Sequence, residues 1–212
     1  MAQSKVSAEY VIDHLMLGAS DLSLGKTWVM DQLGIRATDG GSHPGQGTRN
    51  ALAGFTDHCY LEVIAPDPAQ TLQGTLGEQL LGYSAPSLRT FAVRCAGFDD
   101  LVPRLTILGY RHRILEMSRE TIDGIRLSWR LLFIAGHDYG DRMPFFIDWG
   151  QSPHPSLGLV AAGSLRQITV QLSADLAGYQ RLMTMLDLPV VVTQGPPGLV
   201  ASVHCEQGLV QL

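Results

Sequence analysis

One order of sequence patterns occurs three times along this 212-residue chain: a strand-like segment, a helix-like segment and then further strand-like segments. The three copies begin near residues 10, 88 and 165. Their strand-like segments are short, apolar and bounded by turn-forming residues, which is typical of β-strands. A spacing of roughly 50–75 residues indicates a duplicated structural unit. We therefore predict an α+β fold made of repeated βαβββ modules.

Signals for the ends of helices support this order. Asp21 is suited to cap the start of a helix, and Gly34 is suited to end it. Apolar residues at helical spacing predict another helix over 175–186. The glycine-rich stretch 39–47 (DGGSHPGQG) is predicted to be a turn rather than part of a strand.

The modules are expected to pack together, because a four-stranded sheet has one apolar face that must be covered. Residues 10–65 and 88–150 should pack side by side as one unit over 10–150. Residues 164–212 form a third βαβββ module without an obvious partner. We expect it either to extend the first pair or to pair with its own copy in a homodimer.

Composition narrows the functional classes. The net charge of −5 argues against a nucleic-acid binder, which needs concentrated Lys and Arg. The three cysteines are far apart in the sequence, which favours a reducing compartment. The start of the chain lacks the apolar segment of a signal peptide, and no apolar run has the length of a membrane span. We expect a cytoplasmic protein with no membrane partner.

Several motifs together resemble a known family. The first module contains IDHL, SDL, QLG and YLEVI at residues 12–15, 20–22, 32–34 and 60–64. Longer matches are GGSHPGQGTRNAL at 40–52, YLEVIAPDP at 60–68, PFFIDWG at 144–150 and HPS at 154–156. On these motifs the sequence resembles the vicinal oxygen chelate superfamily, and more narrowly its glyoxalase-like domain type 3. The resemblance covers about residues 10 to 212.

This resemblance implies a curved mixed sheet with helices on the outside and a pocket on its concave face. It also implies a divalent metal (Zn, Fe, Mn or Ni) held by the first and last strands of two paired modules. His14 and Glu62 occupy such strands in module one, and Asp148 is the best match in module two. Such a metal acts as a Lewis acid. The first strand of module two, 88–95, has no His or Glu.

Further residues are candidates for binding a substrate. Arg49 and Asn50 lie on one strand, so only one of them can point into the pocket. Trp149 is expected at the pocket wall or in the core. His43 and His154 stand in HPG and HPS turns, where they either form the loop or line the rim of the pocket.

The main functional hypothesis is a metal-dependent lyase, isomerase or dioxygenase-type enzyme that acts on a small molecule with vicinal oxygens. Two alternatives remain open: a non-catalytic protein that sequesters a small molecule, and a metal-free enzyme with Glu62 as catalytic base. The residues themselves also allow a purely structural interpretation. His14 would then be hydrogen bonded to Asp13, and Glu62 would be paired with Arg49 or Arg94.

Overall fold

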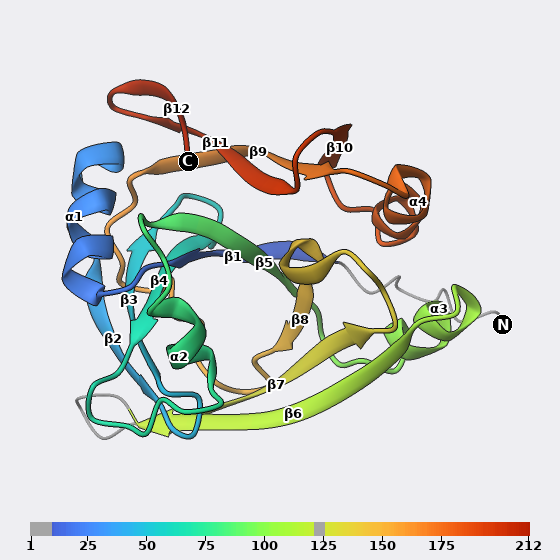
Figure 1. Cartoon of the computed structure of the whole chain (residues 1–212), viewed down its shortest axis with the longest axis horizontal. Helices are drawn as coiled ribbons and strands as arrows, with labels where there is room; N and C mark the ends of the chain where they lie inside the picture. Colours follow the sequence, from blue (N-terminus) through green and yellow to red (C-terminus); the bar gives the residue numbers. More distant parts are fainter. Residues whose placement is uncertain (1–9, 121–125) are drawn as a thin grey trace, which may run out of the picture.

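The computed structural model describes residues 10–120 and 126–212. One curled, mixed sheet of eight strands has the order β2-β3-β4-β1-β5-β8-β7-β6, and a second sheet of four strands has the order β10-β9-β11-β12 (Figure 1). The α+β class and the curved mixed sheet are confirmed. The strands are β1 (Val11–Gly18), β2 (Thr38–His43), β3 (Thr48–Gly54), β4 (Tyr60–Pro66), β5 (Ser87–Arg94), β6 (Arg111–Glu120), β7 (Arg126–Ala135), β8 (Phe145–Asp148), β9 (Gly163–Leu172), β10 (Val190–Gln194), β11 (Gly198–Cys205) and β12 (Gly208–Gln211). The helices are α1 (Leu22–Leu33), α2 (Leu76–Leu80), α3 (Leu101–Ile107), the short 3-10 helix η1 (Gly140–Arg142) and α4 (Leu176–Met185).

The first two modules share the large sheet. In each of them the first strand pairs in parallel with the last one, β1 with β4 and β5 with β8. The two modules meet where β1 and β5 pair antiparallel, and His14 lies opposite Ala92 in that register. The centre of the sheet is therefore built from one strand of each module.

The third segment has the expected order of elements but a different strand pairing. Its first strand, β9, lies between β10 and β11 and is parallel to β10. In the first two modules the first strand pairs instead with the last strand of its own module. The four-stranded sheet of this third segment lies across the large sheet of the same chain (Figure 1), and the homodimer remains a prediction. No helix within the described residues is long and apolar enough to cross a membrane.

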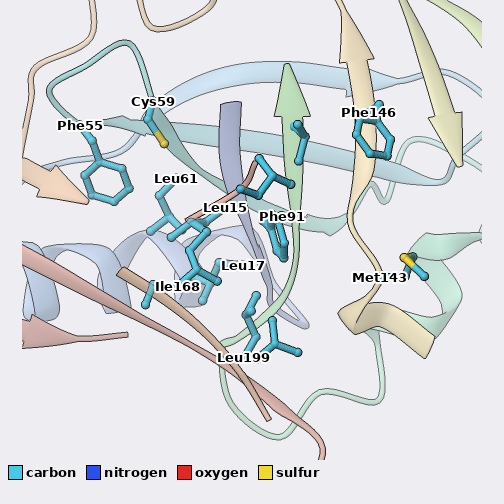
Figure 2. Close-up of a cluster of buried hydrophobic side chains, with 14 of the residues drawn as sticks. Leu15, Leu17, Phe55, Cys59, Leu61, Phe91, Met143, Phe146, Ile168 and Leu199 are labelled. Carbon is cyan, nitrogen blue, oxygen red and sulfur yellow. The ribbon is translucent and has the colours of Figure 1, made fainter. Parts of the chain in front are cut away.

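Apolar side chains join the two sheets on the convex face of the large one. Leu15 and Leu17 of β1 and Phe91 of β5 are fully buried there. Figure 2 shows Ile168 and Leu199, from β9 and β11, gathered with them. Helices α1, α3 and α4 contribute to the same core. Because this face is covered within the chain, the concave face is left for a ligand.

The ends of α1 agree with the sequence signals. The Asp21 side chain accepts hydrogen bonds from the backbone N–H groups of Ser23 and Leu24, and so satisfies donors that the helix leaves free. At the other end Gly34 has a left-handed backbone with φ 71°, and its N–H donates to Met30.

The prediction of a turn over 39–47 is wrong for its first half. Residues 38–43 form β2, which pairs with β3 at the edge of the sheet. Gly40 serves close packing here, because a Cβ atom at this position would lie 2.2 Å from Oδ1 of Asn50. The glycine signal therefore marked a close approach between two strands.

We expect Ile168→Ala to lower the free energy of unfolding of the whole chain by about 2–5 kcal/mol, because it opens a cavity in a core that both sheets share. Chemical denaturation followed by fluorescence and circular dichroism would measure this loss. Val191→Ala, on an exposed position of β10, should change stability by less than about 0.5 kcal/mol. Separate unfolding transitions for the two sheets would contradict the shared core.

Candidate active site

The concave face of the large sheet holds a cavity of about 320 Å³. Alternate residues of the strands line it, as the pleat of a sheet requires. The first module supplies a cluster of polar side chains, which includes His14, His43, Thr48, Asn50, Tyr60 and Glu62, and the second module adds Arg89, Arg113 and Arg119. The second module supplies a largely apolar wall that includes Leu115, Met117, Trp129, Leu131, Phe133, Phe145, Ile147 and Trp149. The cavity therefore has one reactive side and one apolar side.

A β-bulge shapes the polar side. In the pairing of β1 with β5, Ile12 lies opposite Val93 and His14 lies opposite Ala92, so Asp13 is an extra residue. Ile12 packs against the convex core, whereas His14 lines the cavity. The bulge allows Asp13 to bond to groups around the floor of the cavity.

The carboxylate of Asp13 is completely buried. It receives hydrogen bonds from His14 Nδ1 at 2.7 Å, His154 Nε2 at 2.8 Å and Trp149 Nε1 at 3.1 Å. Burial alone would raise the pKa of Asp13, but the hydrogen bonds from His14 and His154 outweigh it and hold the pKa below its usual value. Asp13 is therefore ionised and oriented by three donors.

His14 lies between two carboxylates. Its Nδ1 faces Asp13, and its Nε2 lies 3.6 Å from Oε2 of Glu62. Burial favours the neutral ring, but the hydrogen bond to Asp13 and the charges of Asp13 and Glu62 raise the pKa of His14. The ring stacks on Tyr60 with centroids 4.7 Å apart. The site thus favours an imidazolium whose Nε2–H points towards Glu62.

Asn50 holds the other oxygen of Glu62. Its Nδ2 donates to Glu62 Oε1 at 2.7 Å and lies 3.2 Å from His43 Nε2. Since an amide nitrogen only donates, Nε2 of His43 is the acceptor, and its Nδ1–H faces Thr48 Oγ1 at 3.0 Å. Burial also lowers the pKa of His43. His43 is therefore neutral, in contrast to His14.

The tautomer of His154 is fixed in the same way. The backbone N–H of Ser156 donates to His154 Nδ1 at 3.3 Å, and the Ser156 hydroxyl lies 2.7 Å from the same atom. Nδ1 is thus an acceptor and Nε2 carries the proton that Asp13 receives. The HPS turn therefore delivers a neutral donor to the floor of the site.

The structure brings four of the predicted site residues together. His14, Glu62, Asn50 and Trp149 all line the cavity. The hydrogen bond between His14 and Asp13 that the structural interpretation required is present. The expected pairing of Glu62 with an arginine is wrong, because Glu62 bonds to Asn50 and approaches His14 and His43.

Two predicted residues lie elsewhere. Phe145, Ile147 and Trp149 face the cavity, so Asp148 points to the opposite face and is hydrogen bonded to Arg130. The prediction that Asp148 joins His14 and Glu62 is therefore wrong. The prediction that Arg49 binds a substrate fails for the same reason. Residues alternate between the two faces of a strand, and its neighbours Thr48 and Asn50 are the ones that face the cavity.

A divalent metal does not fit the donors present. Structural and catalytic zinc sites use four or three protein ligands. On the second module, Ala92 lies opposite His14 and packs with Phe145 and Ile147, and none of these three side chains has a donor atom. Within residues 10–120 and 126–212, no group of three or more His, Cys, Asp or Glu side chains is placed to hold a metal ion.

Sequence reasoning underestimated three residues. Asp13 was considered only as a neighbour of His14, because its role depends on a bulge that places it near Trp149 and His154. The HPG and HPS motifs indicate that His43 and His154 lie in turns, and they give little sign of a role in the cavity. The alternation of residues along 38–43 would have pointed His43 to the cavity, had that stretch been recognised as a strand.

The linkage of protonation to folding gives a test. A raised pKa of His14 stabilises the fold below about pH 6.5, the usual histidine pKa, and this contribution is lost as pH rises through the higher folded value. A lowered pKa of Asp13 stabilises the fold above about pH 3.9, and this contribution is lost as pH falls through the lower folded value.

We therefore expect the free energy of unfolding to decrease above about pH 6.5, by at most about 1.4 kcal/mol per pH unit for one proton. In Asp13→Asn this decrease should be much smaller, because the charge that holds the proton on His14 is gone. Urea unfolding between neutral and alkaline pH measures both proteins. Identical pH profiles would contradict the pairing.

Comparisons with known proteins agree with this fold. The sequence matches the glyoxalase-like domain family over residues 12–177. No curated protein sequence matches the chain. A crystal structure of a hypothetical protein from Staphylococcus aureus is similar with a TM-score of 0.72 at 14% identity, and covers 95% of this chain and 98% of its own.

Methylmalonyl-CoA epimerases are also among the similar structures. A variant of the Streptomyces coelicolor enzyme in complex with 2-nitronate-propionyl-CoA has a TM-score of 0.50 at 19% identity, and covers 70% of this chain and 100% of its own. The Mycobacterium tuberculosis enzyme has a TM-score of 0.49 at 24% identity, with 74% of this chain and 95% of its own covered. These likenesses concern the fold. The match over most of the sequence shows that the chain belongs to the glyoxalase-like domain family.

Proposed function

We propose that this protein is an enzyme of the isomerase or lyase type that moves a proton on a carbon atom beside the carbonyl group of a small molecule. Glu62 is the catalytic base, and the His14 imidazolium stabilises the negative charge that develops on the carbonyl oxygen. The supporting observation is the pair formed by His14 Nε2 and Glu62 Oε2, buried 3.6 Å apart at the cavity wall.

The spacing of this pair suits proton transfer. A separation of 3.6 Å is longer than a hydrogen bond, so Glu62 Oε2 keeps its lone pairs available. Glu62 Oε1 is held by Asn50, which fixes the carboxylate plane. His14 cannot turn away, because Asp13 holds its Nδ1. A substrate oxygen near Nε2 of His14 would thus meet a fixed donor while its neighbouring carbon meets the base.

The proposed step balances without an oxidant. Glu62 takes the proton, the C–H electron pair forms a carbon–carbon double bond, and the carbonyl electrons move to oxygen beside His14. Return of the proton to the other face or to another atom gives an isomer, and loss of a group from the next carbon gives a lyase product. Buried donors aimed at such an oxygen stabilise it more than water does.

We propose that this chemistry needs no metal, because His14 supplies the positive charge and the lone pair of His43 Nε2 is already bonded to Asn50. Removal of metals with EDTA should leave the melting temperature and proton exchange unchanged. Elemental analysis of the purified protein should find well under one divalent ion per chain. One tightly bound ion per chain, with exchange lost on chelation, would instead support the metal-dependent enzyme expected from the resemblance.

The catalytic role of Glu62 is tested by exchange of substrate protons with D₂O. A panel of enolisable ketones and 2-oxo acids is incubated with the protein, and loss of the α-proton signal is followed by NMR. Glu62→Gln should lower the exchange rate by about 10²–10⁴-fold, the usual contribution of a general base. It removes the base at nearly constant shape.

Glu116→Gln serves as the matched control, because Glu116 is exposed on β6 and lies outside the cavity lining. It should keep the native rate. Equal exchange by native protein and Glu62→Gln would contradict the role of Glu62. Binding of panel members without any exchange by native protein would favour the sequestering protein.

A further inference from the structure

The charges around the cavity do not balance. Three arginines line it: Arg89, Arg113 and Arg119. Arg89 is paired with Asp141 at 3.2 Å. The imidazolium of His14 lies between the carboxylates of Asp13 and Glu62, so these three groups together carry one negative charge. Among the side chains that the structure describes, no carboxylate lies within 4.0 Å of Arg113 or Arg119. Arg113 and Arg119 outnumber this one negative charge, so the described side chains around the cavity carry an excess of positive charge, which favours an anionic ligand.

Arg119 is the arginine closer to the proposed chemistry. It reaches from β6 across to β2, where its Nη1 donates to the carbonyl oxygen of Gly40. Gly40 packs on Asn50, and Asn50 bonds to Glu62. Burial is the main cause of the low pKa of His43, and the positive charge of Arg119 adds to it. Arg119 is half-buried, so water screens its charge less than that of the exposed Arg113.

A guanidinium has five N–H donors, and its planar fork matches a carboxylate. The bond to Gly40 uses Nη1 and holds the side chain in place. The absence of a side chain at Gly41 leaves room for it, since a Cβ atom there would lie 3.0 Å from Nη1. Arg119 is therefore positioned before any ligand arrives.

The wall of the cavity formed by β7 and β8 suits a flat apolar group. Trp129 and Trp149 have ring centroids 5.4 Å apart, and Phe133 and Phe145 have ring centroids 5.5 Å apart with planes at 26°. Trp129 and Phe133 remain partly exposed to the cavity. The rings of Phe145 and His14 pack in a T-shaped arrangement with their centroids 5.6 Å apart. The aromatic wall thus continues up to the reactive pair.

We infer that the ligand is an aromatic organic acid with a carbonyl group, whose carboxylate is bound by Arg119 and whose ring packs on the wall of Trp129 and Phe133. This assignment rests on the proposed function only for the place of the carbonyl group, between His14 and Glu62. Arg119 is then a specificity-determining residue, and the second module supplies the surface that selects the ring.

Calorimetric titration of the full-length protein with three probes tests the assignment. Phenylpyruvate has the ring, the carbonyl and the carboxylate; phenylacetone lacks the carboxylate; and pyruvate lacks the ring. Phenylpyruvate should bind at least about tenfold more tightly than either of the others, the change expected from loss of one charged or apolar contact. Arg119→Gln should weaken phenylpyruvate about tenfold and leave phenylacetone unchanged.

Arg111→Gln is the control, because Arg111 is exposed on the same strand and lies outside the cavity lining. Arg119→Lys keeps the charge and should restore part of the affinity. If Arg119→Gln fails to fold, the assignment is tested by the order of affinities of the three probes for the native protein. The assignment is overturned if phenylpyruvate does not bind at millimolar concentration, or if phenylacetone binds as tightly. Binding tests the ligand assignment, and proton exchange tests the proposed function. Because the two are measured separately, failure of one does not imply failure of the other.

Discussion

A carboxylate with no exposure to solvent is held in this protein by donors from three parts of the chain. His14 comes from the first strand, Trp149 follows the last strand of the large sheet, and His154 lies in the connection to the third segment. An isolated buried carboxylate would be very costly, so Asp13 requires these partners in order to be charged. Its charge in turn keeps the proton on His14. The hydrogen bonds of Asp13, the pair of His14 and Glu62, and the connection before β9 therefore depend on one another.

The two modules contribute different kinds of side chain to the cavity. The first module carries the groups that hold and move protons, and the second carries the aromatic and aliphatic wall. Related strands meet at the centre, where His14 lies opposite Ala92. A site that used equivalent residues of both modules would place donors on both sides. Here Ala92, Phe145 and Ile147 of the second module have no donor atoms, and the apolar surface beside a charged pair lowers the competition from water.

Much of the fold could be predicted from the sequence. Apolar alternation and helix-ending residues predict the first strand of each module and the helices α1 and α4, because these signals are local. The strand order of residues 163–211 could not be predicted in this way, since the same succession of elements allows β9 to pair with β10 or with the last strand. The glycines of the edge strand β2 predict a turn when only the local sequence is considered, whereas Gly40 is present to accommodate Asn50.

The candidate site shows the same limit. His14 and Glu62 were found through their motifs, and their convergence follows from the parallel pairing of β1 with β4. The prediction for Asp148 is wrong by one position along the strand. A shift of one residue turns a side chain to the opposite face of the sheet. The role of Asp13 depends on a bulge and on contacts more than a hundred positions away along the sequence. No local pattern reports such contacts.

The central claim is that His14 and His43, which lie on either side of Glu62, are in opposite protonation states. A pH titration of the imidazole ¹⁵N resonances, assigned with His14→Gln and His43→Gln, measures this directly. The account predicts that His14 titrates above the usual histidine pKa of about 6.5 and that His43 titrates below it. A His14 that loses its proton below that value, or a His43 that is charged at neutral pH, would contradict the account.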